Sequence, residues 1–212
     1  MLLDNKKFTF VELLIVIALV ALIVSLLQPS LSRILERGRQ TVCANNVNVL
    51  TRSHLIYAED FDGKPLDPTD YLTADGFKSW PNAQGIPDRS LLIVLGYLNS
   101  KEVFMCPSDS KERKDGPSKY IRSASFSYTR NGYTKNVNIN ELNIKSIILA
   151  EEHNYSPMND GTFYSNQWDH LSDRHDGWGH VSFPDGTVKQ LDAIEFNQQT
   201  YKWRIDKYLL PN

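Results

Sequence analysis

The feature that most constrains this chain is an apolar run of twenty residues close to its N-terminus. From Phe8 to Leu27 it reads FTFVELLIVIALVALIVSLL, and Glu12 is its one charged residue. A helix of that length rises about 30 Å, which matches the hydrocarbon core of a bilayer. The run therefore predicts a helix that crosses a membrane over residues 8–28.

A secretory signal and a buried helix of a soluble domain are the two alternatives to a membrane helix. A cleavable secretory signal has an apolar core of about 7–15 residues that ends at small residues. This run is longer, and Gln28-Pro29-Ser30 follows it. A buried helix of a soluble domain needs a large apolar partner, whereas the rest of the chain is rich in Asn, Asp, Ser and Tyr. The sequence therefore favours the membrane helix over both.

Glu12 is unusual in such a run, because a carboxylate at the centre of a bilayer costs roughly 3 kcal/mol on insertion scales. Such residues usually have a partner, and no Lys or Arg lies at helical spacing within the run. Lys7, just before the run, offers partial compensation. Otherwise the partner has to come from another chain, which predicts assembly within the membrane.

Basic residues followed by Phe-Thr-Phe-Val-Glu-Leu-Leu-Ile-Val-Ile-Ala resemble the class III leader of type IV pilins and type II secretion pseudopilins. The resemblance implies that a prepilin peptidase removes residues 1–7 and that the new amine of Phe8 is methylated. It also implies that Glu12 pairs with this amine in a neighbouring subunit. The family nearly always has Gly, sometimes Ala, where this chain has Lys7, so an uncleaved anchor is the alternative.

The helix is expected to continue beyond the membrane. The segment 30–57 has no Pro and one Gly. Apolar residues recur through it at helical spacing: Leu31, Leu35, Val42, Val49 and Ile56, with Cys43, Leu50 and Tyr57 beside them. Residues 29–58 are therefore predicted to be an amphipathic half of one long spine helix, which packs on a globular head of residues 59–212. Pro29 is expected to bend the helix near the junction.

The head is predicted to be a small antiparallel β-sheet domain, which makes the chain an α+β protein. Its turn is clearest at Pro184-Asp185-Gly186, between two short apolar segments, and this pattern is typical of a β-hairpin. The expected elements are a short helix at 89–98, strands at 120–128 and 146–151, a C-terminal hairpin at 181–191 and a partly helical segment at 193–210. Loops are expected at 59–87 and 111–118.

Further segments resemble a subgroup of pilin-like proteins that is abundant in planctomycetes and their relatives. His175, nine intervening residues and then Asp185 and Gly186 match its His-x9-Asp-Gly signature. The subgroup also has Cys-Ala-Asn-Asn late in the long helix, Cys-Pro-Ser-Asp in mid-domain and a Ser-Tyr…Asn-Gly segment, here at 43–46, 106–109 and 127–132. The resemblance implies a pilin-like head on a membrane spine.

The chain has two cysteines, Cys43 and Cys106, too few for a disulfide scaffold or a closed zinc site. In the cytosol they would be free buried thiols, and outside it they would form one bridge. Because the head is expected outside the cytosol, we favour the bridge, which would connect the spine helix to the head.

Several aspartates gather before and within the predicted hairpin, and calcium prefers carboxylates on irregular loops. The candidate ligands are Asp169, Asp173, Asp176 and Asp185. Major pseudopilins of type II secretion bind calcium in a C-terminal loop, so the resemblance adds to this hypothesis. The interpretation that we prefer is structural: Asp185 and Gly186 form the turn, and His175 packs or hydrogen-bonds beside it. No other cofactor is expected.

The sequence argues against nucleic-acid binding and against catalysis. Its 23 basic and 25 acidic residues give a formal charge of -2, without the basic excess that nucleic acid requires. It contains no serine nucleophile elbow, phosphate-binding loop or dinucleotide fingerprint. His170, His175 and His180 match no zinc motif, and the adjacent Glu151 and Glu152 would point to opposite faces of a strand. We therefore expect no enzyme.

The expected function is that of a structural subunit in the bacterial cytoplasmic membrane. The chain would cross once, with a cytoplasmic N-terminus and a head in the periplasm or outside the cell. The resemblance implies three partners besides the lipid bilayer: other pilin-like subunits, a prepilin peptidase and an inner-membrane assembly platform. The product would be a filament related to type II secretion or type IV pili. The alternative is a membrane-tethered binding protein or enzyme that does not polymerise.

Overall fold

The computed structural model describes residues 9–67, 71, 90–109, 126–152, 161–164 and 169–201. The chain divides into two compact units, Met1–Gly38 and Arg39–Asn212. One helix, α1 (Phe10–Asp60), belongs to both, because its first turns lie in the first unit and its later turns in the second. The predicted long helix is confirmed over its described residues, and Pro29 lies inside it without ending it.

The first unit exposes a continuous apolar stretch of α1. Large hydrophobic side chains from Phe10 to Leu35 are all about half exposed or more. Among the described residues, α1 is the one helix that is long and apolar enough to cross a membrane, by length and composition. A helix that is apolar on all sides is stable when lipid or other apolar groups surround it.

The later turns of α1 pack on the head, as predicted, and the expected face is correct in part. Cys43 and Leu50 are buried and Val49 is half-buried, but Val42 is 46% and Ile56 is 51% accessible. Leu31 and Leu35 are exposed in the first unit. The buried residues are Cys43, Asn46, Val47, Leu50, Thr51, Ser53, His54 and Ala58. Half of these are polar or hydrogen-bonding side chains, so the apolar period alone gives only part of the buried face.

The described part of the head contains a five-stranded sheet in the order β3-β1-β2-β4-β5. The strands are β1 (Tyr128–Asn131), β2 (Leu149–Glu151), β3 (Thr162–Phe163), β4 (Trp178–Ser182) and β5 (Val188–Asp192). The sheet is mixed and not purely antiparallel as predicted, because β3 pairs with β1 in parallel. β2 is paired on both of its edges, with β1 on one side and β4 on the other. β3 therefore pairs with the other edge of β1, at the end of the strand order, and it runs parallel to β1.

The C-terminal hairpin is confirmed. β4 and β5 pair antiparallel in a register that places His180 opposite Gln190. At the turn, Asp185 Oδ1 accepts a hydrogen bond from the Thr187 N–H at 2.9 Å, and Gly186 has a φ of +79°, which favours glycine. The helical segment that follows is α4 (Ala193–Tyr201), within the predicted range 193–210.

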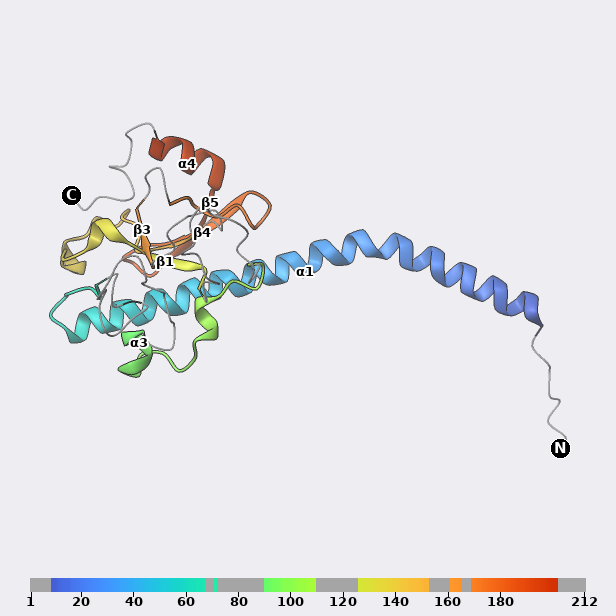
Figure 1. Cartoon of the computed structure of the whole chain (residues 1–212), viewed down its shortest axis with the longest axis horizontal. Helices are drawn as coiled ribbons and strands as arrows, with labels where there is room; N and C mark the ends of the chain where they lie inside the picture. Colours follow the sequence, from blue (N-terminus) through green and yellow to red (C-terminus); the bar gives the residue numbers. More distant parts are fainter. Residues whose placement is uncertain are drawn as a thin grey trace, which may run out of the picture. The chain divides into compact units, whose positions relative to one another are not determined.

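Two cores lie on opposite faces of the sheet, because neighbouring strand residues point to opposite sides. Leu149 of β2 packs with Leu50 of α1 and with Leu92 of α3 (Leu91–Val94). Its neighbour Ala150 packs in the second core with Phe196 of α4. Figure 1 shows the corresponding layers of the head: the later turns of α1 beside the sheet, with α4 beyond it.

The remaining predicted elements agree in part. A short helix forms within 89–98, where the Ser90 hydroxyl accepts a hydrogen bond from the Leu92 N–H at its start. The strand expected at 146–151 is present as the shorter β2. The strand expected at 120–128 overlaps β1 at one residue, and 120–125 lie outside the described residues. The loop at 111–118 and most of 68–87 also lie outside them.

Candidate functional site

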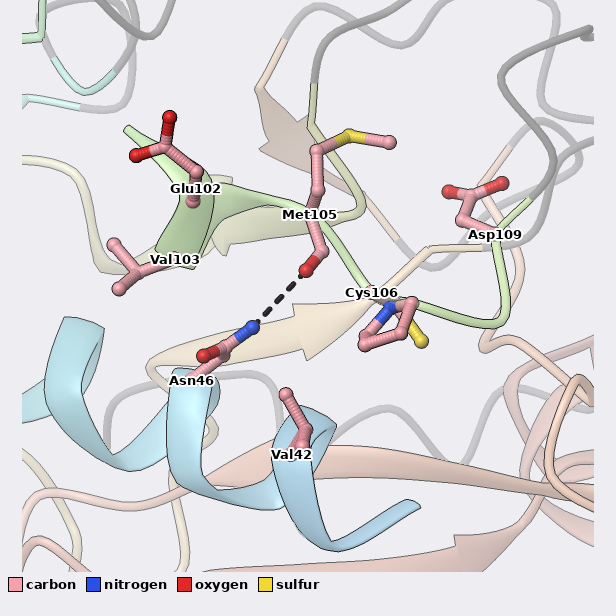
Figure 2. Close-up of a pocket in the computed structure, with 8 residues that line it drawn as sticks. Val42, Asn46, Glu102, Val103, Met105, Cys106 and Asp109 are labelled. Atoms are coloured by element: carbon pink, nitrogen blue, oxygen red, sulfur yellow. Dashed lines mark hydrogen bonds between the residues drawn. The ribbon is translucent and has the colours of Figure 1, made fainter. Parts of the chain in front are cut away.

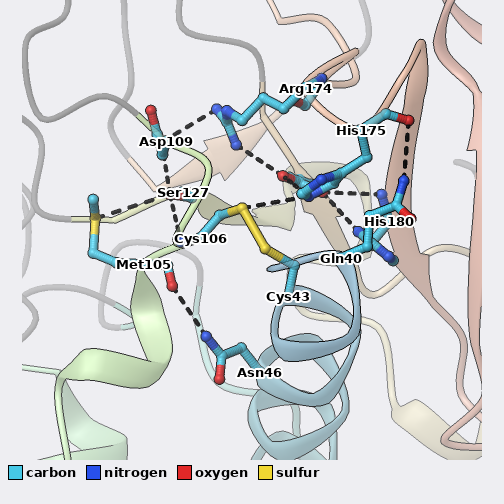
Figure 3. The surroundings of a disulfide bond; sticks show 12 residues. Gln40, Cys43, Asn46, Met105, Cys106, Asp109, Ser127, Arg174, His175 and His180 are labelled. Atoms are coloured by element: carbon cyan, nitrogen blue, oxygen red, sulfur yellow. Dashed lines mark hydrogen bonds and ion pairs between the residues drawn. A yellow bond between two sulfur atoms is a disulfide. The ribbon is translucent and has the colours of Figure 1, made fainter. Parts of the chain in front are cut away.

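The face of the sheet that is turned toward α1 carries a buried polar cluster. Glu151 lies two residues after Leu149 and therefore on the same face, and His180 of β4 lies next to Val181 of the opposite core. We call this cluster the Glu151 network. It consists of Cys43, Cys106, Asp109, Ser127, Glu151, Arg174, His175 and His180 (Figure 3).

Both carboxylate oxygens of the fully buried Glu151 are held by basic groups. Oε1 lies 3.0 Å from Arg174 Nη1 and 3.3 Å from His175 Nε2. Oε2 lies 2.9 Å from His180 Nδ1 and accepts the His180 backbone N–H at 3.2 Å. Burial by itself would raise the pKa of Glu151, but the hydrogen bonds from His175 and His180 and the charge of Arg174 hold this pKa well below its usual range. Glu151 is therefore a buried anion.

Arg174 connects Glu151 to the chain around Cys106. Its Nη2 lies 3.2 Å from Asp109 Oδ2, which also accepts a hydrogen bond from the Ser127 hydroxyl at 2.6 Å. The Ser127 hydroxyl in turn accepts the Cys106 N–H at 2.9 Å. Because removing one member of such a network leaves a buried charge unpaired, the members depend on one another.

Cys43 and Cys106 form a disulfide, which confirms the predicted bridge. It joins α1 to the segment after the short turn Glu102–Phe104, with Cα atoms 5.2 Å apart and a sequence separation of 63. His175 Nε2 lies 3.4 Å from the sulfur of Cys106, so the bridge contacts the Glu151 network directly. In the chain-entropy treatment, closing such a loop stabilises the folded state by roughly 4 kcal/mol.

A groove opens beside the disulfide. It has a volume of about 390 Å³ and lies between α1 and the segment 102–109 (Figure 2). Val42 and Asn46 form the α1 side, and the Asn46 amide donates a hydrogen bond to the Met105 carbonyl at 3.0 Å. Cys106 and Asp109 belong to the opposite side, so the groove lies beside the buried disulfide.

The His-x9-Asp-Gly signature is held at both ends by α1. The Gln40 amide donates to the His175 carbonyl at 3.3 Å, and the Asn48 amide donates to the Gly186 carbonyl at 3.3 Å. The preferred interpretation, in which Asp185 and Gly186 form the turn and His175 is a buried hydrogen-bonding residue, is confirmed. The sequence did not show that His175 contacts the disulfide.

The four candidate calcium ligands are not brought together. Asp169 is buried and accepts the Tyr164 N–H at 2.6 Å, while Asp173 and Asp176 are exposed on the following loop. Asp185 is exposed at the hairpin tip. Among the described residues, the one group of three or more with ligand atoms within 4.8 Å of one another is Cys43, Cys106, Glu151 and His175. These four carboxylates therefore form no cluster in the structure, and calcium binding stays a prediction.

Glu12 accepts hydrogen bonds within its own chain, and its pairing with a neighbouring subunit stays a prediction. Its Oε2 accepts hydrogen bonds from both the N–H and the hydroxyl of Thr9, each at 2.8 Å. The Glu12 N–H donates back to the Thr9 hydroxyl at 3.3 Å, which makes a capping box at the start of α1. The Thr-x-x-Glu spacing was visible in the sequence. Lys7 and Phe8 lie outside the described residues.

The residues that sequence reasoning did not find are those that the fold assembles from distant positions. Glu151, Arg174 and His180 are ordinary polar residues in the sequence, and no spacing rule connects them with Cys106. Glu151 is the last residue of β2, and Glu152 follows it in an isolated bridge with Leu171. That the two side chains point to opposite faces and do not act as a pair stays a prediction.

A second set of buried polar groups lies farther along the same face. Arg130 of β1 is 1% exposed, and its Nη2 donates to the Thr134 hydroxyl at 3.2 Å. Burial lowers the pKa of Arg130 to about 10, although the charge of Asp67 opposes the shift. Burial and the charge of Arg130 lower the pKa of His54 on α1 to about 3, so His54 is neutral at physiological pH.

Comparison with known proteins gave no match: no protein-family model, no curated protein and no solved structure matches this chain.

Proposed function

We propose that this protein is a membrane-anchored structural subunit that assembles through α1 with other pilin-like subunits into a periplasmic or surface filament. The observation that carries the proposal is the contrast within α1. Its side chains from Phe10 to Leu35 are exposed and almost entirely apolar, whereas the turns from Cys43 to Ala58 are buried in the head. A helix of this kind requires lipid around it before assembly and neighbouring helices after assembly.

The disulfide supports a head outside the cytoplasm, because such bonds persist in oxidising compartments. Because the N-terminus resembles a prepilin leader, we also propose that the protein lies in the bacterial cytoplasmic membrane and that a prepilin peptidase and an assembly platform act on it. The filament would then be related to type II secretion or type IV pili. In this proposal the head carries no catalytic function, and the Glu151 network holds the spine helix to the sheet.

A second candidate function is favoured by the capping box. Because Thr9 already satisfies the Glu12 carboxylate, a simple membrane anchor also accounts for this residue. Lys7, where the family has Gly, points in the same direction. The chain would then be a membrane-tethered extracytoplasmic binding protein or enzyme that does not polymerise.

Processing separates the two candidates. Full-length protein is purified from membranes, and its intact mass and N-terminal sequence are measured. The filament proposal predicts a chain that begins at Phe8 and carries one extra methyl group, and Lys7→Gly should increase the processed fraction. A chain that retains residues 1–7 in cells containing active prepilin peptidase supports the tethered protein.

The role of Glu12 is tested with a matched pair of variants. Glu12→Leu removes the carboxylate, and Thr9→Val removes only the hydroxyl that takes part in the cap. If Glu12 acts between subunits, Glu12→Leu abolishes filament assembly in sheared fractions while Thr9→Val retains it. If Glu12→Leu assembles as well as the unmodified protein, the filament proposal is wrong. Equal losses in both variants assign Glu12 to capping alone.

A further inference from the structure

We propose that, when the disulfide is reduced, Cys43, Cys106, His175 and Glu151 bind one zinc ion in its place. The four ligand atoms, two Sγ, His175 Nε2 and a Glu151 carboxylate oxygen, lie within 4.8 Å of one another, and all four residues are buried. They come from α1, the segment after residue 104, the loop before β4, and β2. This inference does not rest on the filament proposal.

The spacing of the nitrogen, oxygen and sulfur atoms already fits a zinc tetrahedron. Zinc bond lengths place a nitrogen and an oxygen ligand about 3.3 Å apart, and a sulfur and a nitrogen ligand about 3.6 Å apart. His175 Nε2 lies 3.3 Å from Glu151 Oε1 and 3.4 Å from Cys106 Sγ. Two zinc-bound sulfurs lie about 3.8 Å apart, close to the van der Waals contact of two separate sulfur atoms. Opening the disulfide therefore supplies the sulfur–sulfur edge, and the other three pairs of ligand atoms lie within 4.8 Å of one another.

The donor set selects zinc over calcium. Two thiolates, an imidazole and a carboxylate are zinc ligands, whereas calcium requires a shell of oxygens. Binding also leaves the charge of the network unchanged, because Zn²⁺ cancels the charges of the two thiolates. Arg174 stays paired with both Glu151 and Asp109. Two thiolates without a metal would lack such compensation.

Groups outside the ligand set hold two of the ligands in place. Glu151 Oε2 is fixed by His180 Nδ1 and the His180 N–H, which leaves Oε1 directed toward His175. The Cys106 backbone is fixed by its hydrogen bond to Ser127. Such outer contacts orient metal ligands and reduce the rearrangement that binding requires.

The conversion has a defined stoichiometry. The disulfide takes two electrons and two protons from a dithiol, which becomes a disulfide, and two thiols result. Zinc then binds both sulfurs as thiolates and releases two protons. Cys106 lines the groove and is 2% exposed, whereas Cys43 is fully buried, so in this proposal the reductant attacks the bond from the Cys106 side (Figure 2). Because the metal joins the same two cysteines, α1 stays connected to the head in both redox states.

The test uses the full-length chain in detergent micelles, reduced without oxygen by a phosphine. The phosphine and one water become a phosphine oxide while the disulfide becomes two thiols. Titration with Co²⁺ should give one ion per chain, with a thiolate-to-cobalt charge-transfer band and the ligand-field bands of a tetrahedral site. Zinc should displace the cobalt with a Kd below about 1 μM. The oxidised protein should give no charge-transfer band.

Two variants make the test specific. His175→Gln should weaken zinc binding by at least about 100-fold, because the loss of outer contacts alone costs 10–100-fold. Asp185→Asn, at the exposed hairpin tip, should bind zinc like the unmodified chain. Formation of the disulfide in oxidised His175→Gln checks that the variant folds.

X-ray absorption at the zinc edge should count two sulfur and two nitrogen or oxygen ligands in the unmodified reduced protein. This count is independent of whether the His175→Gln variant folds. The proposal is overturned if the reduced protein shows no sulfur-to-cobalt band, if zinc has a different ligand count, or if a folded His175→Gln variant binds zinc as tightly as the unmodified chain.

Discussion

The two halves of α1 form one continuous helix but differ in how their side chains are stabilised. In the first half, to Gly38, apolar residues cover every side from Leu13 to Leu27, and none of the most apolar window is buried. In the second half, from Arg39, the buried face mixes Cys43, Val47 and Leu50 with polar residues that hydrogen-bond to the head. Both halves are regular helix, but only the second half has a face whose shape and hydrogen-bonding groups match another part of the same chain, the head.

The largest effect is expected from a charge on the buried face. Leu50→Asp places a carboxylate in the core beside the sheet and should reduce the free energy of unfolding by about 4 kcal/mol or more. Val42→Asp, on the exposed face of the same helix, should change it by less than about 1 kcal/mol. Denaturant unfolding of the full chain in micelles measures both. Equal effects would show that the buried face has been assigned incorrectly.

The next effect concerns the covalent link between the second half and the head. Replacing both cysteines, Cys43→Ser with Cys106→Ser, should reduce the free energy of unfolding by roughly 4 kcal/mol in the chain-entropy treatment. The measurement is made with a metal chelator present, so that no ion binds near the remaining groups. A loss below about 1 kcal/mol would show that packing alone fixes α1 to the head.

A smaller loss is expected when the anion at the centre of the network is removed. Glu151→Gln leaves Arg174 with less compensation inside the head and should cost about 3 kcal/mol. Glu141→Gln, outside the core, is the control and should change stability by less than about 0.5 kcal/mol. The two variants are compared by thermal unfolding at neutral pH. A stable Glu151→Gln variant would contradict a central role for this carboxylate.

Acid should weaken the head through His54. Its pKa is about 3 in the folded chain against 6.5 for an unperturbed histidine, so the unfolded state binds more protons between these values. The contribution of neutral His54 is present above pH 6.5 and is lost as the pH falls toward 3, by at most about 1.4 kcal/mol per pH unit. Unfolding curves of His54→Gln should lose this part of the slope, whereas His170→Gln should keep it.

The smallest effect is expected from the first half of α1. Leu22→Ala lies in the separate first unit and should change the free energy of unfolding of the head by less than about 0.5 kcal/mol. The same substitution at Leu50 should cost about 2–5 kcal/mol. Denaturant unfolding compares the two. A large effect of Leu22→Ala would show that the two units are energetically coupled.

The parts of the fold that the sequence predicted are those set by local patterns. Periodicity gave the long helix, Pro184-Asp185-Gly186 gave the hairpin, and the apolar segment ending at Glu151 gave β2. Strand pairing was harder to predict from the sequence, because the parallel pairing of β3 with β1 depends on which sheet edges the other strands occupy. Of the site, the sequence predicted the two cysteines and the hydrogen-bonding role of His175. Arg174 and Glu151 come together by tertiary packing, and no spacing in the sequence predicts their contact.

The sequence by itself determined that the chain has one long helix, which begins with an apolar stretch of membrane length, and that an α+β head follows this helix. It did so because apolar periodicity and turn residues act over a few neighbouring positions. The tertiary structure decided which face of the second half is buried and which groups surround the disulfide. These depend on strand register, which turns Glu151 and His180 toward α1 and leaves Val42 exposed. A buried polar face carries no apolar signature, so only the folded chain identifies it.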